Sequence, residues 1–221
     1  MFEFTRLTGA GAAAALHALV FGEGERGVRA FYAPDAEREI HGVFDGDVLV
    51  SALSFFPVEV GGAACVYMAG VCTHPDYRGR GLFRRNFAQA KAATAYDARN
   101  LFCIPANDSL FGLYESVGLR KRTCASLVSL DGSGSGGGYA FDGDYERLYA
   151  LYLASGPDVR HPFPLFRACV DNFLAAGSAY YVQDGFALID GAGVRFACGA
   201  DADGLRGLLS GRFAWLTRAG Q

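Results

Sequence analysis

Hydrophobic and polar residues alternate over the first part of the chain in a way that predicts strands joined by tight turns. Segments rich in β-branched and aromatic residues predict three strands, over 39–44, 48–60 and 64–73. Asp45-Gly46 and Gly61-Gly62 separate them, and such pairs adopt the positive φ angles that two-residue hairpins need. We therefore expect an antiparallel meander, in which the nearly uninterrupted apolar segment 48–56 is covered on both faces.

Apolar residues at helical spacing flank this meander. Leu16, Leu19 and Val20 predict a helix within 9–21, and Phe83 and Phe87 predict another over 82–96. The other elements expected are a strand over 2–7, a helix over 29–32 that stops before Pro34, a strand over 101–105, a helix capped by Asp108 that runs to Val117 and stops at Gly118, and a strand over 119–130. This order predicts an α+β fold with a mixed, mostly antiparallel central sheet flanked by helices.

The segment 131–138 (DGSGSGGG) has the composition of a flexible linker. Beyond it, apolar periodicity predicts two helices, followed by strands over 180–183, 186–189 and 194–198. We therefore divide the chain into a domain over 1–130, the linker, and an α+β extension over 139–221. Because helix, helix and hairpin repeat the order at the start of the chain, we interpret the extension as a partial second copy of the same fold.

Composition and charge narrow the functional classes. The chain has 221 residues, of which 51% are apolar and 19% charged, and its formal net charge is -3. Nucleic-acid-binding proteins usually carry a basic patch, and no run of Lys or Arg suggests one here, so no nucleic-acid partner is expected. The apolar segment 9–21 is too short to cross a bilayer, and Glu3 and Arg6 before it do not form the basic cluster of a signal peptide. We expect a cytoplasmic protein that does not associate with a membrane.

The cysteines and histidines give no sign of a metal site. Six cysteines are scattered along the chain, at Cys65, Cys72, Cys103, Cys124, Cys169 and Cys198. None is spaced as C-x-x-C, and the four histidines are also dispersed, so we expect no metal. Reduced, mostly buried thiols are expected instead.

The segment 71–83 (VCTHPDYRGRGLF) places a predicted strand, a glycine- and arginine-containing turn and a helix start in succession. The first N–H groups of a helix lack intrahelical partners, and the helix dipole favours an anion there. Glycine lets the backbone approach a phosphate closely, and Arg78, Arg80 and Arg84 add positive charge. The segment therefore predicts a phosphate-binding site.

Two common phosphate-binding motifs do not fit this segment. The dinucleotide fingerprint G-x-G-x-x-G would need glycine where Arg84 stands, and the Walker sequence G-x-x-x-x-G-K-[ST] does not occur. Both motifs also belong to parallel sheets, whereas the strands predicted here are antiparallel. A dinucleotide-dependent oxidoreductase is therefore disfavoured.

The segment 78–83 (RGRGLF) resembles the signature [QR]-x-x-G-x-[GA] of the GNAT superfamily of acyl-CoA N-acyltransferases, with Phe83 in place of a small residue. Downstream, Asn107, Tyr114 and Gly118-Leu119 are similar to the family's N-x(6)-Y-x(3)-G-[FL] ending. The resemblance covers about residues 1–130. The order of elements beyond it looks like the middle portion of larger, tandem members such as the Eis-type aminoglycoside acetyltransferases.

This resemblance implies a function and a binding site. Acetyl-CoA would be the acyl donor and co-substrate, and a primary amine of a small molecule or peptide would attack it directly. In such folds the strand before the turn splays from its neighbour, so that its free main-chain groups bind the pantetheine arm and one N–H polarises the thioester carbonyl. The implied coenzyme-binding residues are Val71, Cys72, Thr73, Arg78, Gly79, Arg80, Gly81, Leu82, Phe83 and Asn107.

The resemblance also suggests catalytic roles. Tyr114 is the candidate general acid that protonates the departing CoA thiolate, although its helix face could simply pack in the core. Asn107 either binds the pantetheine amide or caps the helix, and Cys72 is expected to pack on the strand rather than carry the acyl group. The general base is unassigned, because the strand over 64–73 has no carboxylate and the candidates Glu59 and His74 are more typical of solvated surface.

Two other functions stay open. The protein could transfer a longer acyl group, since the sequence does not reveal the width of the acyl pocket. The missing carboxylate also suits an acyl-CoA-binding sensor without catalysis. The aromatic residues of the extension are consistent with core packing or with a homodimer interface.

Overall fold

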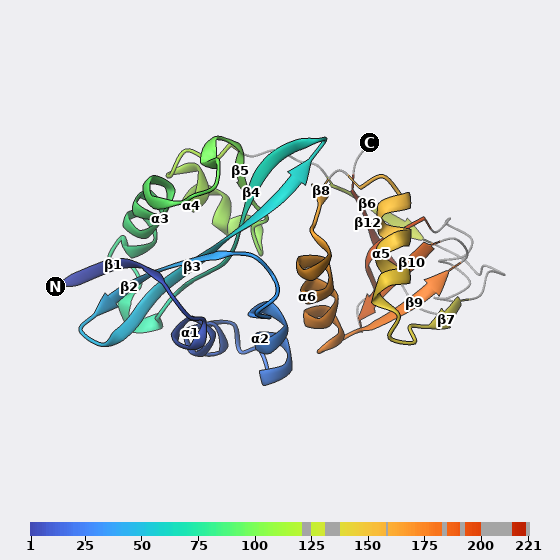
Figure 1. Cartoon of the computed structure of the whole chain (residues 1–221), viewed down its shortest axis with the longest axis horizontal. Helices are drawn as coiled ribbons and strands as arrows, with labels where there is room; N and C mark the ends of the chain where they lie inside the picture. The colour runs from blue at the N-terminus through green and yellow to red at the C-terminus, as the bar shows by residue number, and fades with distance from the viewer. Residues whose placement is uncertain are drawn as a thin grey trace. The chain divides into compact units, whose positions relative to one another are not determined.

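The chain divides into two compact units, Met1–Arg122 and Thr123–Gln221 (Figure 1), in a computed structural model. The structure describes residues 1–120, 125–130, 138–157, 159–182, 185–190, 193–199 and 214–219. Within these ranges no helix is both long enough and apolar enough to cross a bilayer.

The first unit consists of helices and the strands of one sheet. Its elements are β1 (Phe2–Leu7), α1 (Gly11–Phe21), α2 (Glu25–Phe31), β2 (Glu39–Asp45), β3 (Val48–Val60), β4 (Ala63–Thr73), the 3-10 turn η1 (Pro75–Tyr77), α3 (Leu82–Ala93), η2 (Ala98–Asn100), β5 (Leu101–Cys103), η3 (Asp108–Leu110) and α4 (Phe111–Glu115).

The strands of this unit lie in the order β1-β2-β3-β4-β5. The first four pair antiparallel and β5 pairs parallel to β4, so the predicted mixed, mostly antiparallel sheet is confirmed. The turn between β3 and β4 has positive φ angles at Gly61 and Gly62, of 55° and 82°. Glycine accepts these angles without steric strain, which explains why the hairpin forms here.

Two apolar layers cover the sheet, with α1 and α2 on one face and α3 and α4 on the other (Figure 1). The first layer packs Leu16 and Val28 against Ala52 and Cys72 of the sheet. The second packs α3 and α4 against inward residues that include Leu53, Phe55, Val66 and Met68. Residues 49–56 of β3 are all buried, as expected for a central strand covered on both faces.

The buried face of α1 differs from the prediction. Leu19 is 57% exposed, whereas Ala13, Leu16 and His17 are buried. The helix ends at Gly22, which has φ of 67° and donates its N–H to the Ala18 carbonyl. Apolar spacing misassigned this face because alanine packs closely against the sheet and a buried histidine leaves no hydrophobic signal.

Three predicted boundaries also change. Helix α3 ends at Ala93 rather than at 96, because Thr94 has extended backbone angles. Asn107 rather than Asp108 caps the next helical turn, and its side chain accepts the Ser109 N–H at 3.1 Å. The strand expected over 119–130 is observed as β6 (Ala125–Leu130), which pairs with β12 (Ala214–Ala219) in the second unit.

A buried carboxylate joins distant segments of the first unit. Glu39 in β2 is 1% exposed and lies 3.0 Å from the Arg6 guanidinium of β1 and 3.1 Å from His41 Nε2. It also accepts the Ala95 N–H at 3.1 Å, just after α3. Hydrogen bonds to the charged form outweigh burial, which alone would raise the pKa, so the pKa of Glu39 is lowered.

The second unit has its own sheet and core. Its further elements are β7 (Gly138–Ala140), α5 (Tyr145–Ala154), β8 (Val159–Arg160), α6 (Phe163–Leu174), β9 (Ser178–Val182), β10 (Gly185–Asp190) and β11 (Gly193–Cys198). Strands β11-β10-β9-β7 pair antiparallel, and Leu148 and Phe166 of the helices pack against Tyr181 and Phe186 of the strands. The expected helices and hairpin are present, and most of the predicted linker, over 131–137, lies outside the described residues.

Candidate functional site

The turn between β4 and α3 has the backbone conformation of an anion site. Gly79 and Gly81 have φ angles of 75° and 71°, and no atom lies within 4 Å of where a Cβ would stand on either residue. Gly81 caps α3 without a side-chain hydrogen bond, and the helix begins with Arg85 N–H donating to the Gly81 carbonyl at 3.2 Å. The N–H groups of the first turn therefore have no intrahelical acceptor and border open space.

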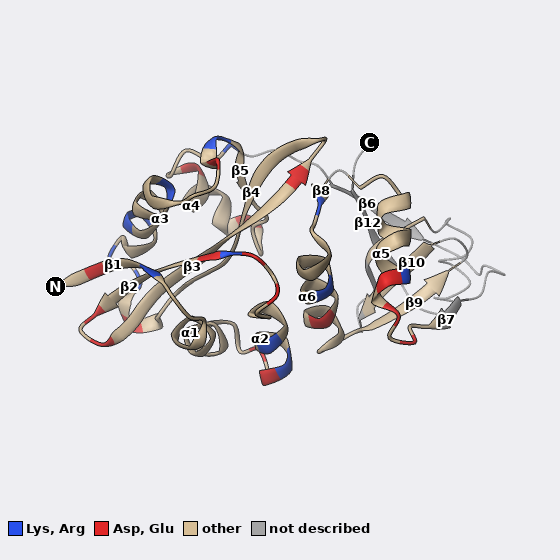
Figure 2. Ribbon diagram, viewed as in Figure 1, with Lys and Arg blue, Asp and Glu red and all other residues tan. Residues whose placement is uncertain are grey.

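Cations surround this turn and continue along α3. Arg84, Arg85 and Lys91 lie on α3, which carries no acidic residue (Figure 2). Arg78 Nε donates to the Thr73 carbonyl at 3.3 Å, and Arg80 donates to the Asp76 carbonyl at 3.0 Å. These bonds fix the two arginines of the turn, and the helix dipole adds to their positive potential.

The Phe83 side chain turns inward, away from the turn. Its ring contacts Phe87 and Tyr114, with centroid separations of 6.0 and 5.7 Å, inside the core between α3 and the sheet. The bulky residue at the family's small position therefore does not fill the anion site.

The edge of β4 next to the turn is open. Its pairing with β5 ends at Met68 and Cys103, so residues 69–73 run beyond the end of that neighbour. A bulge also interrupts the pairing with β3, because Ser54 opposes Ala69 and Ala52 opposes Cys72, with Gly70 and Val71 between them. The expected splay of β4 from β5 is thus present in the backbone.

The alternating direction of the backbone groups along β4 determines which of them face this open edge. The Cys72 carbonyl accepts the Ser51 hydroxyl at 3.1 Å and the His74 N–H donates to the Val50 carbonyl at 2.8 Å, so both residues point their backbone toward β3. Successive residues of a strand present their N–H groups to opposite sides. Thr73 therefore faces the open edge and Cys72 does not, whereas Val71 lies in the bulge, where this alternation is interrupted.

The Cys72 thiol is a core group. It is buried among the residues that α1 and α2 pack on the sheet, and burial raises its pKa to about 12. A thiol that is protonated at neutral pH is a poor nucleophile.

Tyr114 lies where β4 and β5 separate. It is 8% exposed and packs among residues of the α3 layer, with Cys103 at the end of β5 beside it. Burial, and secondarily Cys103, raises the pKa of the phenol to about 12, so the hydroxyl carries its proton at neutral pH. Asn107 caps the helical segment that holds Tyr114, because its Oδ1 also accepts the Ser109 hydroxyl at 2.5 Å.

The two base candidates lie away from the bulge. Glu59 on β3 opposes Ala64, which is about 20 Å along the strand from Gly70. His74 caps the η1 turn, where its Nδ1 accepts the Asp76 N–H at 3.3 Å. A third group, His17, lies beside Gly70, with Nδ1 3.7 Å from the position of an added Cβ. No motif marked it, because its partners lie on other elements.

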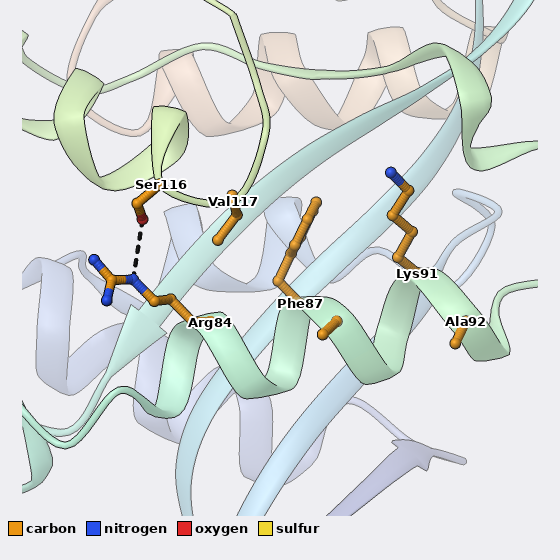
Figure 3. A pocket seen from close by; sticks show the side chains of 7 residues that line it. Arg84, Phe87, Lys91, Ala92, Ser116 and Val117 are labelled. Carbon is orange, nitrogen blue, oxygen red and sulfur yellow. Dashed lines mark hydrogen bonds between the residues drawn. The ribbon is translucent and has the colours of Figure 1, made fainter.

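A pocket of about 500 Å³ opens between α3 and the end of α4 (Figure 3). Arg84 and Lys91 of α3 supply its cations, and Phe87 and Val117 supply apolar surface. Arg84 Nε donates to the Ser116 hydroxyl at 3.0 Å across the pocket (Figure 3). Within the described ranges, no cluster of three His, Cys, Asp or Glu side chains is arranged to hold a metal.

Comparisons with known proteins agree with this geometry. A family model described as an acetyltransferase (GNAT) domain matches residues 8–120. No curated protein matches the chain in sequence.

Several solved structures share the fold. A probable N-acyltransferase of unknown function from Enterococcus faecalis V583 has a TM-score of 0.67 at 12% identity, over 99% of this chain and 66% of its own. A GCN5-related N-acetyltransferase from Kribbella flavida has a TM-score of 0.58 at 18% identity, over 99% of this chain and 64% of its own. The likeness in fold thus extends beyond residue 130, and this chain spans less than two thirds of the length of either protein.

Proposed function

The chain belongs to the GNAT acetyltransferase superfamily, whose members transfer acyl groups from coenzyme A, and we propose that it transfers an acetyl group from acetyl-CoA to a primary amine of a small molecule or peptide. The observation that carries this proposal is the adjacency of two features. The glycine turn at Gly79–Gly81, at the start of α3, lies next along the chain to the open, bulged edge of β4.

The turn is proposed to hold the diphosphate of the coenzyme. Free N–H groups in the first turn of α3 donate to the phosphate oxygens, and the positive end of the helix dipole stabilises their charge. The space beside Gly79 and Gly81 lets the diphosphate approach the main chain.

The pocket between α3 and α4 is proposed to take the nucleotide end. Its cations Arg84 and Lys91 suit a phosphate, and Phe87 and Val117 add apolar surface. The diphosphate site at the start of α3 and this pocket share Arg84, so a single extended ligand can occupy both.

The pantetheine arm then lies along residues 69–73 of β4. The main-chain groups of Val71 and Thr73 are proposed to supply its hydrogen bonds. The Val71 N–H, held at the bulge, polarises the thioester carbonyl and stabilises the negative charge that develops on its oxygen.

Acyl transfer is proposed to be direct. The amine attacks the thioester carbon, the C–S bond breaks, and the Tyr114 hydroxyl gives its proton to the departing sulfur. Burial keeps the phenol protonated at neutral pH, so its proton is available for the sulfur. The buried Cys72 thiol does not take part as an acyl carrier.

A non-catalytic acyl-CoA sensor is the second candidate, because β4 (Ala63–Thr73) carries no carboxylate to act as a base. Calorimetry with acetyl-CoA and a thiol-release assay over a panel of primary amines separate the two. The enzyme binds acetyl-CoA and releases CoA thiol with at least one amine, whereas a sensor binds and releases none. No binding at all would contradict both.

A further inference from the structure

A buried histidine and glutamate occupy the apolar layer under the β4 bulge. His17 on α1 is 3% exposed, and its Nε2 lies 3.3 Å from Oε2 of Glu23, just after the helix. Both atoms are shielded from water, and neither makes a well-aligned hydrogen bond with any described residue. The pair is thus close enough to interact, although no other polar group holds it in place.

The imidazole faces the bulge itself. Gly70 has φ of 61°, and an added Cβ would stand 3.7 Å from His17 Nδ1 and 2.8 Å from Phe31 Cζ. The Phe31 ring also lies against His17, with centroids 4.8 Å apart, and it is half-buried. The Phe31 ring therefore stands beside both the Gly70 bulge and the imidazole.

Packing alone does not account for the pair. The neighbours of His17 are Ala13, Leu16, Phe21, Phe31 and Tyr32, so an apolar side chain would fit the same layer. Replacing a buried ion pair by well-packed apolar residues is often neutral or stabilising. Buried titratable groups with shifted pKa values are enriched at functional sites.

Neighbouring groups determine which ring nitrogen is free. The Glu23 carboxylate faces Nε2, so the neutral ring carries its hydrogen there and keeps a lone pair on Nδ1. The Tyr32 hydroxyl lies 3.3 Å from the Ala13 carbonyl and 3.5 Å from Nδ1. When its single hydrogen goes to the carbonyl, Nδ1 is left available as a proton acceptor.

We propose that His17 is the general base of acyl transfer, with Nδ1 as the accepting atom and Glu23 as the residue that positions it; this inference rests on the proposed function. As the amine forms its bond to the thioester carbon, its nitrogen becomes positively charged and acidic. Nδ1 takes that proton, the C–S bond then breaks, and the sulfur receives a proton from Tyr114. His17 and Tyr114 regain their starting states through water, so amine and thioester become amide and thiol.

The charges around His17 support this role. Burial lowers the pKa of His17, and the Glu23 carboxylate opposes this to a smaller extent, so the ring is neutral at pH 7 and able to accept a proton. Tyr32 and Cys72, which face it from α2 and β4, have raised pKa values because they are buried, and are uncharged. Arg38 stacks over Tyr32, and its guanidinium donates to main-chain carbonyls. Glu23, at 34% exposed, links the ring to water.

The first test is a pH profile with acetyl-CoA and the amine that the panel shows to react fastest, with kcat/KM expressed per free amine. In the unmodified protein, kcat/KM falls as the pH drops through the pKa of His17, which is lowered from 6.5. This decline is the acidic limb of the profile. His17→Gln lowers kcat/KM about 100-fold and removes this limb. Glu23→Gln moves the limb to lower pH, because the carboxylate that raised the pKa is gone.

Two matched variants control for structural damage. Glu25→Gln removes an exposed carboxylate two residues after Glu23, at the start of α2, and His41→Gln breaks a comparably buried pair with Glu39 on β2. Both are expected to keep the acidic limb. Unaltered turnover and an unaltered limb in His17→Gln, with acetyl-CoA binding intact, would overturn the inference alone. Failure of the unmodified protein to bind acetyl-CoA would instead contradict the proposed function.

A second measurement does not depend on the acceptor. Nitrogen-15 NMR of the histidine rings, with coenzyme A bound at pH 7, reports which nitrogen of His17 carries hydrogen. The inference requires hydrogen on Nε2 and a bare Nδ1. A ring protonated on Nδ1 would refute it even if no amine of the panel reacts.

Discussion

At the scale of single residues, the Tyr114 hydroxyl is the group proposed to protonate the departing CoA sulfur. Its ring packs against Phe83 in the core, so the phenol is held at the point where β4 and β5 separate. Replacing Tyr114 by phenylalanine removes only the hydroxyl oxygen and keeps this packing. Any loss of activity then reports the role of the hydroxyl in catalysis.

Tyr114→Phe is expected to reduce kcat about 100-fold while leaving the affinity for acetyl-CoA unchanged, because only the proton donor is lost. Steady-state kinetics and calorimetry measure the two effects. Tyr96→Phe is the matched control, since that hydroxyl bonds Glu37 on the surface and is expected to be dispensable. Full turnover in Tyr114→Phe would instead show that water protonates the departing sulfur.

Cys72→Ala tests direct transfer. Turnover is expected to persist, with a loss in the free energy of unfolding of roughly 1 kcal/mol from the missing buried atom. Mass spectrometry of the unmodified protein incubated with acetyl-CoA alone is expected to show no acetyl group on Cys72. A trapped acetyl-cysteine together with an inactive variant would establish a covalent route.

Sequence alone could reach some of these residues and not others. Tyr114 and the glycines of the turn stand at fixed spacings within one stretch of chain, so a pattern can find them. His17 could not be found, because its meaning depends on Glu23, Phe31 and the bulge at Gly70, which meet only in the folded chain. The place of Cys72 on the strand could be predicted, but only the pairing of β4 with β3 shows that its backbone faces β3.

At the scale of elements, the start of α3 is the feature at which coenzyme binding is proposed. Gly81→Ala forces alanine into φ of 71°, a left-handed conformation that costs about 1 kcal/mol of stability. The added methyl also stands where the diphosphate is proposed to lie. We expect at least a tenfold loss of acetyl-CoA affinity by calorimetry.

Gly22→Ala is the matched control for this prediction. Gly22 has φ of 67° at the end of α1, again with no atom within 4 Å of an added Cβ. It is expected to destabilise the protein by a similar amount without changing the affinity for acetyl-CoA. Equal affinity losses in both variants would show that strain, and not the site, is responsible.

Glu39 ties β1, β2 and the end of α3 together, and its lowered pKa makes stability depend on pH. A carboxyl whose pKa is lower in the folded state stabilises the protein above its unfolded value of 4.5, and this is lost as the pH falls through the folded value. Chemical unfolding from pH 7 to 3 is expected to show this decline. Glu39→Gln is expected to lower stability at pH 7 by about 3 kcal/mol and to flatten the decline; an unchanged slope would contradict the assignment.

The predictability of the elements followed the strength of their local signals. The meander was predictable because Asp45-Gly46 and Gly61-Gly62 fix its turns. The continuous apolar segment of β3 also has to be covered on both faces of the sheet, as in a central strand. The end of α3 was not, since Thr94 leaves the helix at a place where the apolar spacing continues. The pairing of β6 with β12 could not be predicted, because β12 lies far along the chain.

At the scale of the whole molecule, the first unit contains all the residues proposed to act on the thioester. The family match over residues 8–120 lies within this unit, Met1–Arg122. The fold of the second unit, two helices on an antiparallel sheet, is shared with longer acyltransferase-like structures.

The most direct test of the account is a crystal structure of the protein with coenzyme A. It is expected to show the diphosphate within hydrogen-bonding distance of the first N–H groups of α3, and the pantetheine arm along Val71 and Thr73. A diphosphate bound away from the Gly79–Gly81 turn, or an arm that avoids the open edge of β4, would contradict it.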